Sequence, residues 1–134
     1  MPDAPPHRLA PPAAWLAIGA FTVFTGGCEL RERDPPHAAA DAAQVQRGQR
    51  LLAQYQCGSC HSIPEVASAR GHVGPPLAAF GRRSYIAGHL PNRPDTLARW
   101  IAEPAALVPD TTMPSMGVSA GDARDIAAYL MTLE

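Results

Sequence analysis

Two cysteines and a histidine stand close together in residues 57–61, which read Cys-Gly-Ser-Cys-His. Thiols three positions apart can each form a thioether bond to one vinyl group of a haem, and the imidazole that follows can bind the iron from one side. This spacing is typical of c-type haem attachment. The sequence therefore predicts one covalent haem c on Cys57 and Cys60, with His61 as a ligand of its iron.

The same pair of cysteines is compatible with two other chemistries. A zinc site needs two further cysteine or histidine ligands at matching spacing, but the remaining cysteine, Cys28, lies far upstream in an apolar context. His72 and His89 form no paired ligand motif, and we expect both on surface loops. A dithiol oxidoreductase sets its pair in a βαβ unit, and no Val/Ile-rich strand pattern lies near Cys57. The sequence favours haem and leaves zinc and dithiol chemistry as alternatives.

The composition of the 134 residues favours a small domain around a large apolar group. Aromatic residues make up 6% of the chain and 15 residues are proline, so the side chains alone would build a thin core. A buried haem would supply the missing apolar bulk. The formal net charge of −1 argues against nucleic acid as a partner. All basic residues are arginine, since the chain has no lysine.

The amino-terminal residues predict export and a membrane tether. The apolar run at 15–25 is shorter than a membrane span of about 20 residues and has the length of a signal-peptide core. Two glycines precede Cys28, which resembles the acylated cysteine of bacterial lipoproteins. We expect a signal peptide at 1–27 and a lipid anchor at Cys28, with cleavage elsewhere or an uncleaved anchor as alternatives. Mixed charges and a Pro-Pro pair indicate that 28–40 is a flexible linker.

Three segments downstream have the apolar spacing of helices. The first is predicted to begin at Asp41, with Gln44 in capping-box spacing, and leads directly to the Cys-x-x-Cys-His motif. The second begins at Pro94 and ends before Pro104. The third begins near Ser119. Its apolar residues recur at helical spacing: Ile126, Tyr129, Leu130 and Leu133.

The segments between these helices are rich in glycine and proline and are expected to be loops. Long loops in a small domain need something to pack on, and a haem would serve. Tyr129 is expected to pack on the first helix near Gly48, where a missing side chain permits close approach. Residues 41–134 are therefore predicted to form one all-α domain.

From residue 41 onward the chain resembles a bacterial class I cytochrome c. The resemblance is carried by the Cys-x-x-Cys-His motif, a Gly-Pro-x-Leu loop at 74–77, a methionine strap at 109–114 and a closing helix over 122–130, in that order. It implies a cytochrome c fold with three main helices and long loops around one haem. It also implies that Met113 is the second axial ligand and that the Pro75 carbonyl accepts a hydrogen bond from His61 Nδ1.

Three further residues take expected roles from the same resemblance. Arg82 matches an arginine near a haem propionate, Thr111 matches a residue in the other propionate region, and Trp100 matches an aromatic that lines the haem crevice. Arg82 is equally compatible with a surface position, and Trp100 with the helix core. Met116 lies one helical turn beyond Met113 and stays as an alternative ligand.

Axial ligation by His61 and Met113 would leave no place on the iron for oxygen or peroxide. The sequence thus predicts a one-electron carrier rather than an enzyme, without a small-molecule substrate. Its partners would be redox proteins of a respiratory chain: a quinol-oxidising complex or dehydrogenase as donor and a terminal oxidase as acceptor. Its expected location is the periplasmic side of a bacterial membrane. The alternatives are a haem subunit of a larger respiratory complex or, if Met113 does not bind, a haem sensor or peroxidase.

Overall fold

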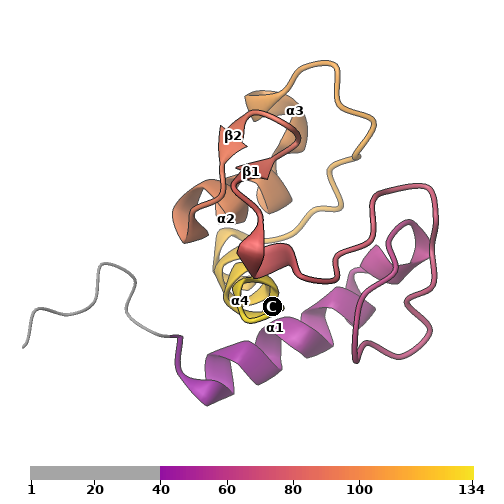
Figure 1. Ribbon diagram of the computed structural model, residues 1–134, viewed down its shortest axis with the longest axis vertical. Helices are drawn as coiled ribbons and strands as arrows, with labels where there is room; N and C mark the ends of the chain where they lie inside the picture. The colour runs from indigo at the N-terminus through magenta and orange to yellow at the C-terminus, as the bar shows by residue number, and fades with distance from the viewer. Residues whose placement is uncertain (1–39) are drawn as a thin grey trace, which may run out of the picture. The chain divides into compact units, whose positions relative to one another are not determined.

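The computed structural model describes residues 40–134, and the predicted signal peptide, Cys28 and nearly all of the predicted linker lie outside these residues. Four helices and a small hairpin make up the described part (Figure 1). In chain order the elements are α1 (Ala42–Gln54), the 3₁₀ turns η1 (Cys57–Ser59) and η2 (Phe80–Arg82), β1 (Tyr85–Ile86), β2 (Leu90–Pro91), α2 (Pro94–Ala102), α3 (Pro104–Leu107) and α4 (Ala120–Met131). Within residues 40–134 no helix is long and apolar enough to cross a membrane. The predicted all-α fold is confirmed.

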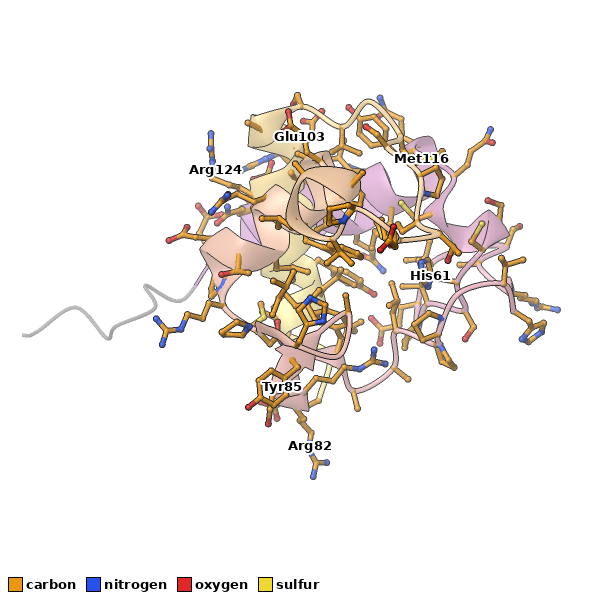
Figure 2. The ribbon with its side chains drawn as sticks, turned by 90° about the horizontal axis from the view of Figure 1, so that it is seen from above. His61, Arg82, Tyr85, Glu103, Met116 and Arg124 are labelled. Atoms are coloured by element: carbon orange, nitrogen blue, oxygen red, sulfur yellow. The ribbon has the colours of Figure 1, made fainter. Side chains whose placement is uncertain are left out.

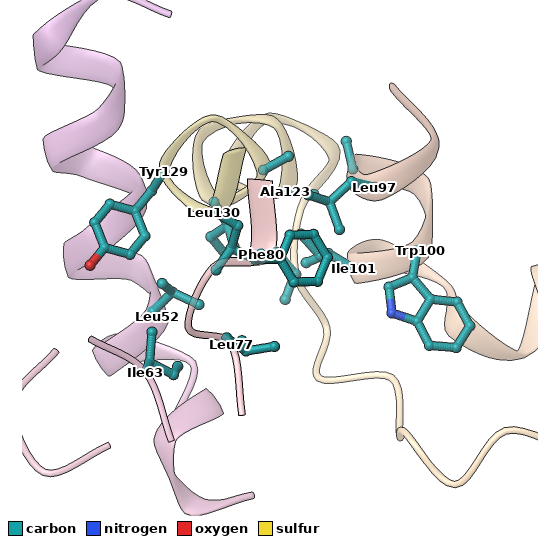
Figure 3. Packing of buried hydrophobic residues seen from close by; sticks show 14 of the residues in the cluster. Leu52, Ile63, Leu77, Phe80, Leu97, Trp100, Ile101, Ala123, Tyr129 and Leu130 are labelled. Atoms are coloured by element: carbon teal, nitrogen blue, oxygen red, sulfur yellow. The ribbon is translucent and has the colours of Figure 1, made fainter. Parts of the chain in front are cut away.

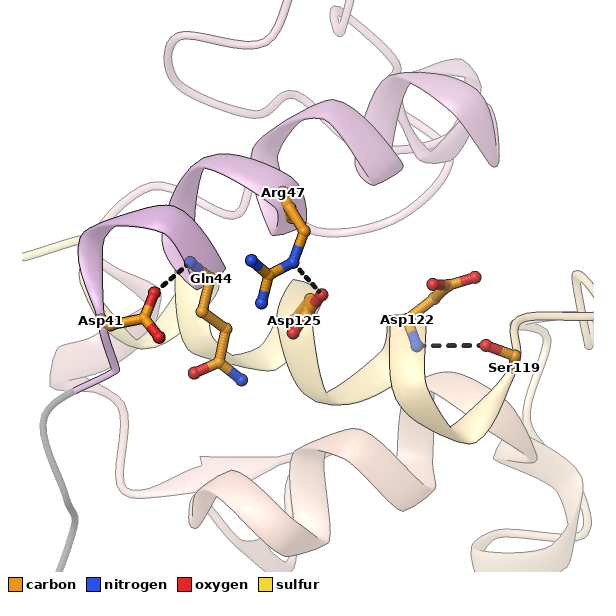
Figure 4. Close-up of polar contacts among 6 residues, drawn as sticks. All are labelled: Asp41, Gln44, Arg47, Ser119, Asp122 and Asp125. Atoms are coloured by element: carbon orange, nitrogen blue, oxygen red, sulfur yellow. Dashed lines mark hydrogen bonds and ion pairs between the residues drawn. The ribbon is translucent and has the colours of Figure 1, made fainter.

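Side-chain caps set the starts of α1 and α4 (Figure 4). Asp41 Oδ1 accepts a hydrogen bond from the Gln44 backbone N–H at 2.6 Å, so α1 begins where the capping pattern predicted. Ser119 Oγ accepts one from the Asp122 backbone N–H at 3.1 Å and starts α4 in the same way. Both caps satisfy a backbone donor that the first helical turn leaves unpaired.

Helix α4 packs against α1 on one side and α2 on the other (Figure 1). The α1–α4 crossing depends on Gly48, because a Cβ there would lie 2.6 Å from the Asp125 carbonyl carbon and 3.0 Å from Tyr129 Cβ. The predicted packing of Tyr129 near Gly48 is thus confirmed. Arg47 Nε donates to Asp125 Oδ2 at 2.9 Å beside this crossing (Figure 4).

The apolar core lies where α1, α2 and α4 meet the loops between residues 62 and 80 (Figure 3). Leu52, Leu97 and Ile126, one from each long helix, are at most 1% exposed. Tyr129 is also buried, and its hydroxyl donates to the Pro64 carbonyl oxygen at 2.7 Å. Desolvation accordingly raises the pKa of Tyr129. This bond ties the closing helix to the loop that follows the Cys-x-x-Cys-His motif.

The short helix α3 and the hairpin of β1 and β2 were not predicted from the sequence. Pro104 ends α2 as expected but also opens the short helix α3, because proline lacks an N–H to continue one helix and suits the first position of another. The hairpin of β1 and β2 pairs Ile86 with Leu90 and Tyr85 with Pro91. Its strands of two residues each are too short to show an alternating pattern.

Candidate functional site

The Cys-x-x-Cys-His motif forms a single tight turn after α1. The backbone N–H groups of Cys60 and His61 both donate to the Cys57 carbonyl oxygen, at 3.2 Å and 3.0 Å. All three side chains line the same cavity. Both thiols are free and half-buried, and burial raises the pKa of the Cys57 thiol. Local hydrogen bonding therefore brings the two sulfur atoms and the imidazole to one wall.

The loop after the motif folds back and packs closely on it. The Gly71 N–H donates to the Gly58 carbonyl oxygen at 3.0 Å, and the Gly74 N–H donates to the Cys60 carbonyl oxygen at 2.8 Å. A Cβ at Gly71 would lie 2.6 Å from the Cys60 nitrogen, so this approach requires glycine. The loop thus fixes the backbone on which the cysteines and His61 stand.

The imidazole of His61 is held in one orientation. Its Nδ1 lies 2.7 Å from the Pro75 carbonyl oxygen, which is the contact expected for Pro75. Because a carbonyl only accepts, Nδ1 carries the proton and the lone pair of Nε2 stays free for a metal. Gly74 lets the ring lie against the backbone, since a Cβ there would come within 2.6 Å of Nδ1.

The cavity beside His61 is mainly apolar and draws its walls from all three long helices. Trp100 is 8% exposed and lines it, as expected for an aromatic of the crevice. Its buried aliphatic and aromatic lining, part of which appears in Figure 3, consists of Leu52, Leu77, Phe80, Ile86, Leu97, Trp100, Ile101, Ile126 and Leu130. An apolar wall of this kind suits the faces of a porphyrin better than a hydrated ion.

A strap between α3 and α4 closes the cavity. Met113 lines it and is the only methionine among residues 40–134 that does. Thr111 also lines the cavity, and its Oγ1 accepts a hydrogen bond from the Met113 N–H at 3.2 Å, which holds the strap. Met116, the alternative ligand, is 43% exposed and does not line the cavity. His72 and His89 are exposed and also lie outside it.

The arginine at the cavity is Arg83, whereas Arg82 was expected there. Arg82 is exposed and points away from the cavity (Figure 2), because the 3₁₀ turn η2 carries it to the surface and turns the next residue inward. Arg83 Nη2 donates to the Pro76 carbonyl oxygen, and its guanidinium lies 5.0 Å from the centroid of the Phe80 ring. The arginine expected at the cavity is therefore Arg83 and not Arg82.

Asn92 supports this arginine and was missed in the sequence. Its Nδ2 donates to the carbonyl oxygens of Phe80 and Arg83, both at 3.0 Å, and its backbone N–H donates to the Ser84 carbonyl oxygen at 3.0 Å. These bonds join β2 to the segment that carries Arg83. No sequence signal distinguished Asn92 from a loop asparagine, since its partners come from a different segment.

The groups on this cavity fit a covalently attached haem. They comprise two thiols, an imidazole with a free Nε2 and one thioether, all on an apolar lining. Among residues 40–134, no three or more His, Cys, Asp or Glu side chains are grouped so as to hold a metal ion directly. The fold and these groups together are those of a small helical protein that holds haem c by thioether bonds.

Comparison with known proteins supports the assignment to this class of haem-binding protein. Residues 45–134 match the model of the cytochrome c family, and the chain belongs to this family. It therefore binds haem c covalently, with its iron, and has a role in electron transfer. The chain is 32% identical over 115 residues to cytochrome c oxidase subunit 2 of Alkalihalophilus pseudofirmus, a match of 85% of this chain and 31% of that protein.

A second relative carries the same name. Cytochrome c oxidase subunit 2 of Bacillus subtilis is 23% identical over 94 residues, which cover 69% of this chain and 26% of that protein. The chain thus spans less than a third of the length of these relatives.

Proposed function

We propose that this cytochrome c carries single electrons in a respiratory chain, from a quinol-oxidising complex or dehydrogenase to a terminal oxidase. The observation that carries the proposal is the position of Met113 on the cavity that His61 also lines. A thioether and an imidazole on one iron would leave no site for a substrate, so the protein would transfer electrons without being an enzyme. The bound haem supplies a reversible one-electron couple.

Six residues of the cavity have a defined part in this proposal. Cys57 and Cys60 hold the porphyrin covalently, and His61 offers Nε2 to the iron while Pro75 fixes its ring. Met113 offers its sulfur from the strap, which favours a relatively high reduction potential. Arg83 is the one arginine or lysine on the cavity within residues 40–134, and it would balance the charge of the haem propionates.

A second candidate function is that of the haem-carrying part of an oxidase subunit. The similarity to two proteins named cytochrome c oxidase subunit 2 favours it, since 85% of this chain matches one of them. The same cavity would serve both functions, with the electron passed on inside the assembly in the second. Co-purification with an oxidase in mild detergent supports the second candidate, and isolation of the cytochrome alone under the same conditions supports the first.

Absorption spectra of the exported holoprotein, oxidised and reduced, with and without carbon monoxide, test the carrier function. We expect a low-spin spectrum with a ferric methionine-to-iron band that carbon monoxide does not change. Met113→Ala should keep the haem but lose this band, lower the potential and bind carbon monoxide. Met116→Ala is the matched control and should behave as the unmodified protein. A high-spin spectrum of the unmodified protein that shifts with carbon monoxide would instead favour a sensor or peroxidase.

A further inference from the structure

The position of Arg83 on the haem cavity depends on the η2 turn. Arg82 and Arg83 are neighbours in the chain, yet Arg82 is exposed and Arg83 lines the cavity. The turn spans three residues and begins after Ala79, whose φ of 52° lies in the left-handed region that few residues other than glycine adopt. A short turn with such a start is held by contacts from its surroundings rather than by its own sequence.

Asn92, the only asparagine of the chain, supplies such contacts from the position that follows β2. Its Nδ2 donates to the carbonyl oxygens of Phe80 and Arg83, the first residue of the turn and the residue that follows it, both at 3.0 Å. Carbonyl oxygens only accept, so the amide nitrogen and not Oδ1 faces them. The Asn92 backbone N–H donates to the Ser84 carbonyl oxygen at 3.0 Å. One residue thus fixes both ends of the turn.

The side chain of Arg83 packs on the segment that precedes the turn. Its Nη2 donates to the Pro76 carbonyl oxygen and lies 3.4 Å from the Ala78 carbonyl oxygen, and its guanidinium lies 5.0 Å from the centroid of the Phe80 ring. Within residues 40–134, Arg83 is the one Asp, Glu, Lys or Arg side chain that lines the cavity. Within the same residues no carboxylate forms an ion pair with it. Its positive charge therefore acts at the cavity without an anionic partner from the described chain.

A fixed positive charge beside the cavity favours the reduced form of a haem bound there. Reduction adds one electron to the haem and forms or breaks no bond, so the ferrous state is the more negative of the two. A cation beside an apolar cavity attracts this added charge more strongly than a cation surrounded by water, because the effective dielectric constant is lower. If Arg83 turned out into solvent, water and salt would screen its charge. The reduction potential therefore depends on where the guanidinium is held.

We propose that Asn92 is a positioning residue that sets the reduction potential of this cytochrome through Arg83. The two hydrogen bonds from Nδ2 keep the turn closed, and the closed turn keeps the guanidinium at the cavity. Asn92 does not itself line the cavity, so its effect on the haem passes through the arginine. The inference rests on the proposed carrier function and adds a residue that tunes it.

The test is a spectroelectrochemical titration of the full-length holoprotein, with soluble mediators that carry electrons from the electrode, at neutral pH and constant ionic strength. Arg83→Ser should favour the oxidised form about tenfold, which is a fall of about 59 mV for a one-electron couple. Asn92→Ala should lower the potential in the same direction and by no more than this. Asn92→Asp keeps the shape of the side chain but loses both donors, so it should lower the potential as well. An unchanged methionine-to-iron band shows that the axial ligands are the same in each variant.

The double variant separates positioning from a general loss of structure. If Asn92 acts only through Arg83, Asn92→Ala should cause no further shift of the potential in the Arg83→Ser background. Arg82→Ser removes the neighbouring exposed arginine and should leave the potential unchanged. Gly48→Ala disturbs the α1–α4 crossing at a residue that does not line the cavity, so it should lower stability without changing the potential.

Three results would overturn the role of Asn92 and leave the carrier function standing: an unchanged potential in Asn92→Ala, an unchanged potential in Arg83→Ser, or additive shifts in the double variant. If Asn92→Ala yields no holoprotein, Asn92→Gln, which moves the amide outward by one methylene group, replaces it under the same criteria. A haem in the unmodified protein that cannot be reduced and reoxidised reversibly would overturn the carrier function as well.

Discussion

The orientation of His61 depends on two residues, Gly74 and Pro75, whose side chains carry no functional group. Gly74 leaves room for the ring, and the Pro75 carbonyl accepts the Nδ1 proton at 2.7 Å. A hydrogen bond at Nδ1 makes the imidazole a better electron donor at Nε2. Both residues lie in the Gly-Pro-x-Leu segment, so this segment would influence an iron bound at Nε2 through the His61 ring alone.

Gly74→Ala should therefore disturb the haem site more than one added methyl group suggests. The new Cβ would lie 2.6 Å from Nδ1, so the ring must move and the bond to Pro75, worth about 1 kcal/mol, is lost or lengthened. We expect a lower yield of holoprotein and a changed reduction potential, measured by spectroelectrochemical titration. Gly121→Ala is the control, because its Cβ meets only Ser119 Oγ at 3.8 Å. Equal yields and potentials for both variants would contradict this role of Gly74.

The helices reach their positions through contacts that are far apart in the chain. Gly48 lets α1 and α4 cross closely, and Arg47 pairs with Asp125 beside the crossing at 2.9 Å. Tyr55, just after α1, donates its hydroxyl to Asp122 at 2.7 Å, and this bond raises the pKa of Tyr55. These contacts join the middle and the end of α1, which leads into Cys57, to the first turns of α4.

Gly48→Ala should weaken the α1–α4 crossing. The added Cβ would lie 2.6 Å from the Asp125 carbonyl carbon, which is backbone and cannot turn aside as a side chain can. We expect the free energy of unfolding to fall by about 1–3 kcal/mol, the usual cost of overpacking. Denaturant titration of the holoprotein measures it. Gly121→Ala, also a helical glycine replaced by alanine, should cause no loss, and an equal loss in both variants would rule out the steric explanation.

The Arg47–Asp125 pair should make the stability of the folded protein depend on pH. The hydrogen bond from Arg47 lowers the pKa of Asp125 below its usual 3.8. A carboxylate with a lower pKa in the folded state adds stability above pH 3.8 that is lost as pH falls through the folded pKa. Asp125→Asn should lower stability at neutral pH slightly and make the difference from the unmodified protein vanish in acid. Thermal unfolding at several pH values checks it, and high salt should shrink the difference because the pair lies at the surface.

The described domain is built around its cavity. Helices α1, α2 and α4 all supply apolar side chains that line the cavity, so a haem bound there would complete the core that these few large side chains begin. We propose that the protein is exported and tethered through Cys28.

Cys28→Ser tests the tether. If an acyl group on Cys28 anchors the chain, the variant should move from the membrane fraction to the soluble periplasmic fraction with its haem spectrum unchanged. Cell fractionation followed by haem staining measures the distribution. If the Cys28→Ser variant stays in the membrane fraction after a high-salt wash, the result would favour an uncleaved anchor. It would contradict the proposal that a lipid on Cys28 anchors the chain.

Several features were accessible from the sequence because they depend on neighbours along the chain. The spacing of Cys57, Cys60 and His61 is set within one turn, and it favoured covalent haem over zinc or dithiol chemistry. The caps at Asp41 and Ser119 act over three residues, so the starts of α1 and α4 were also predicted. The apolar spacing of α4 predicted its buried face in the same way.

Other features depend on residues that only folding brings together. The choice of Arg83 over Arg82 follows from the η2 turn and the bonds from Asn92, and the placement of Met113 rather than Met116 on the cavity follows from the path of the strap. The cavity lining joins segments that no local pattern connects. Tertiary packing sets each of these arrangements, because each side chain is placed by contacts with elements remote in the sequence.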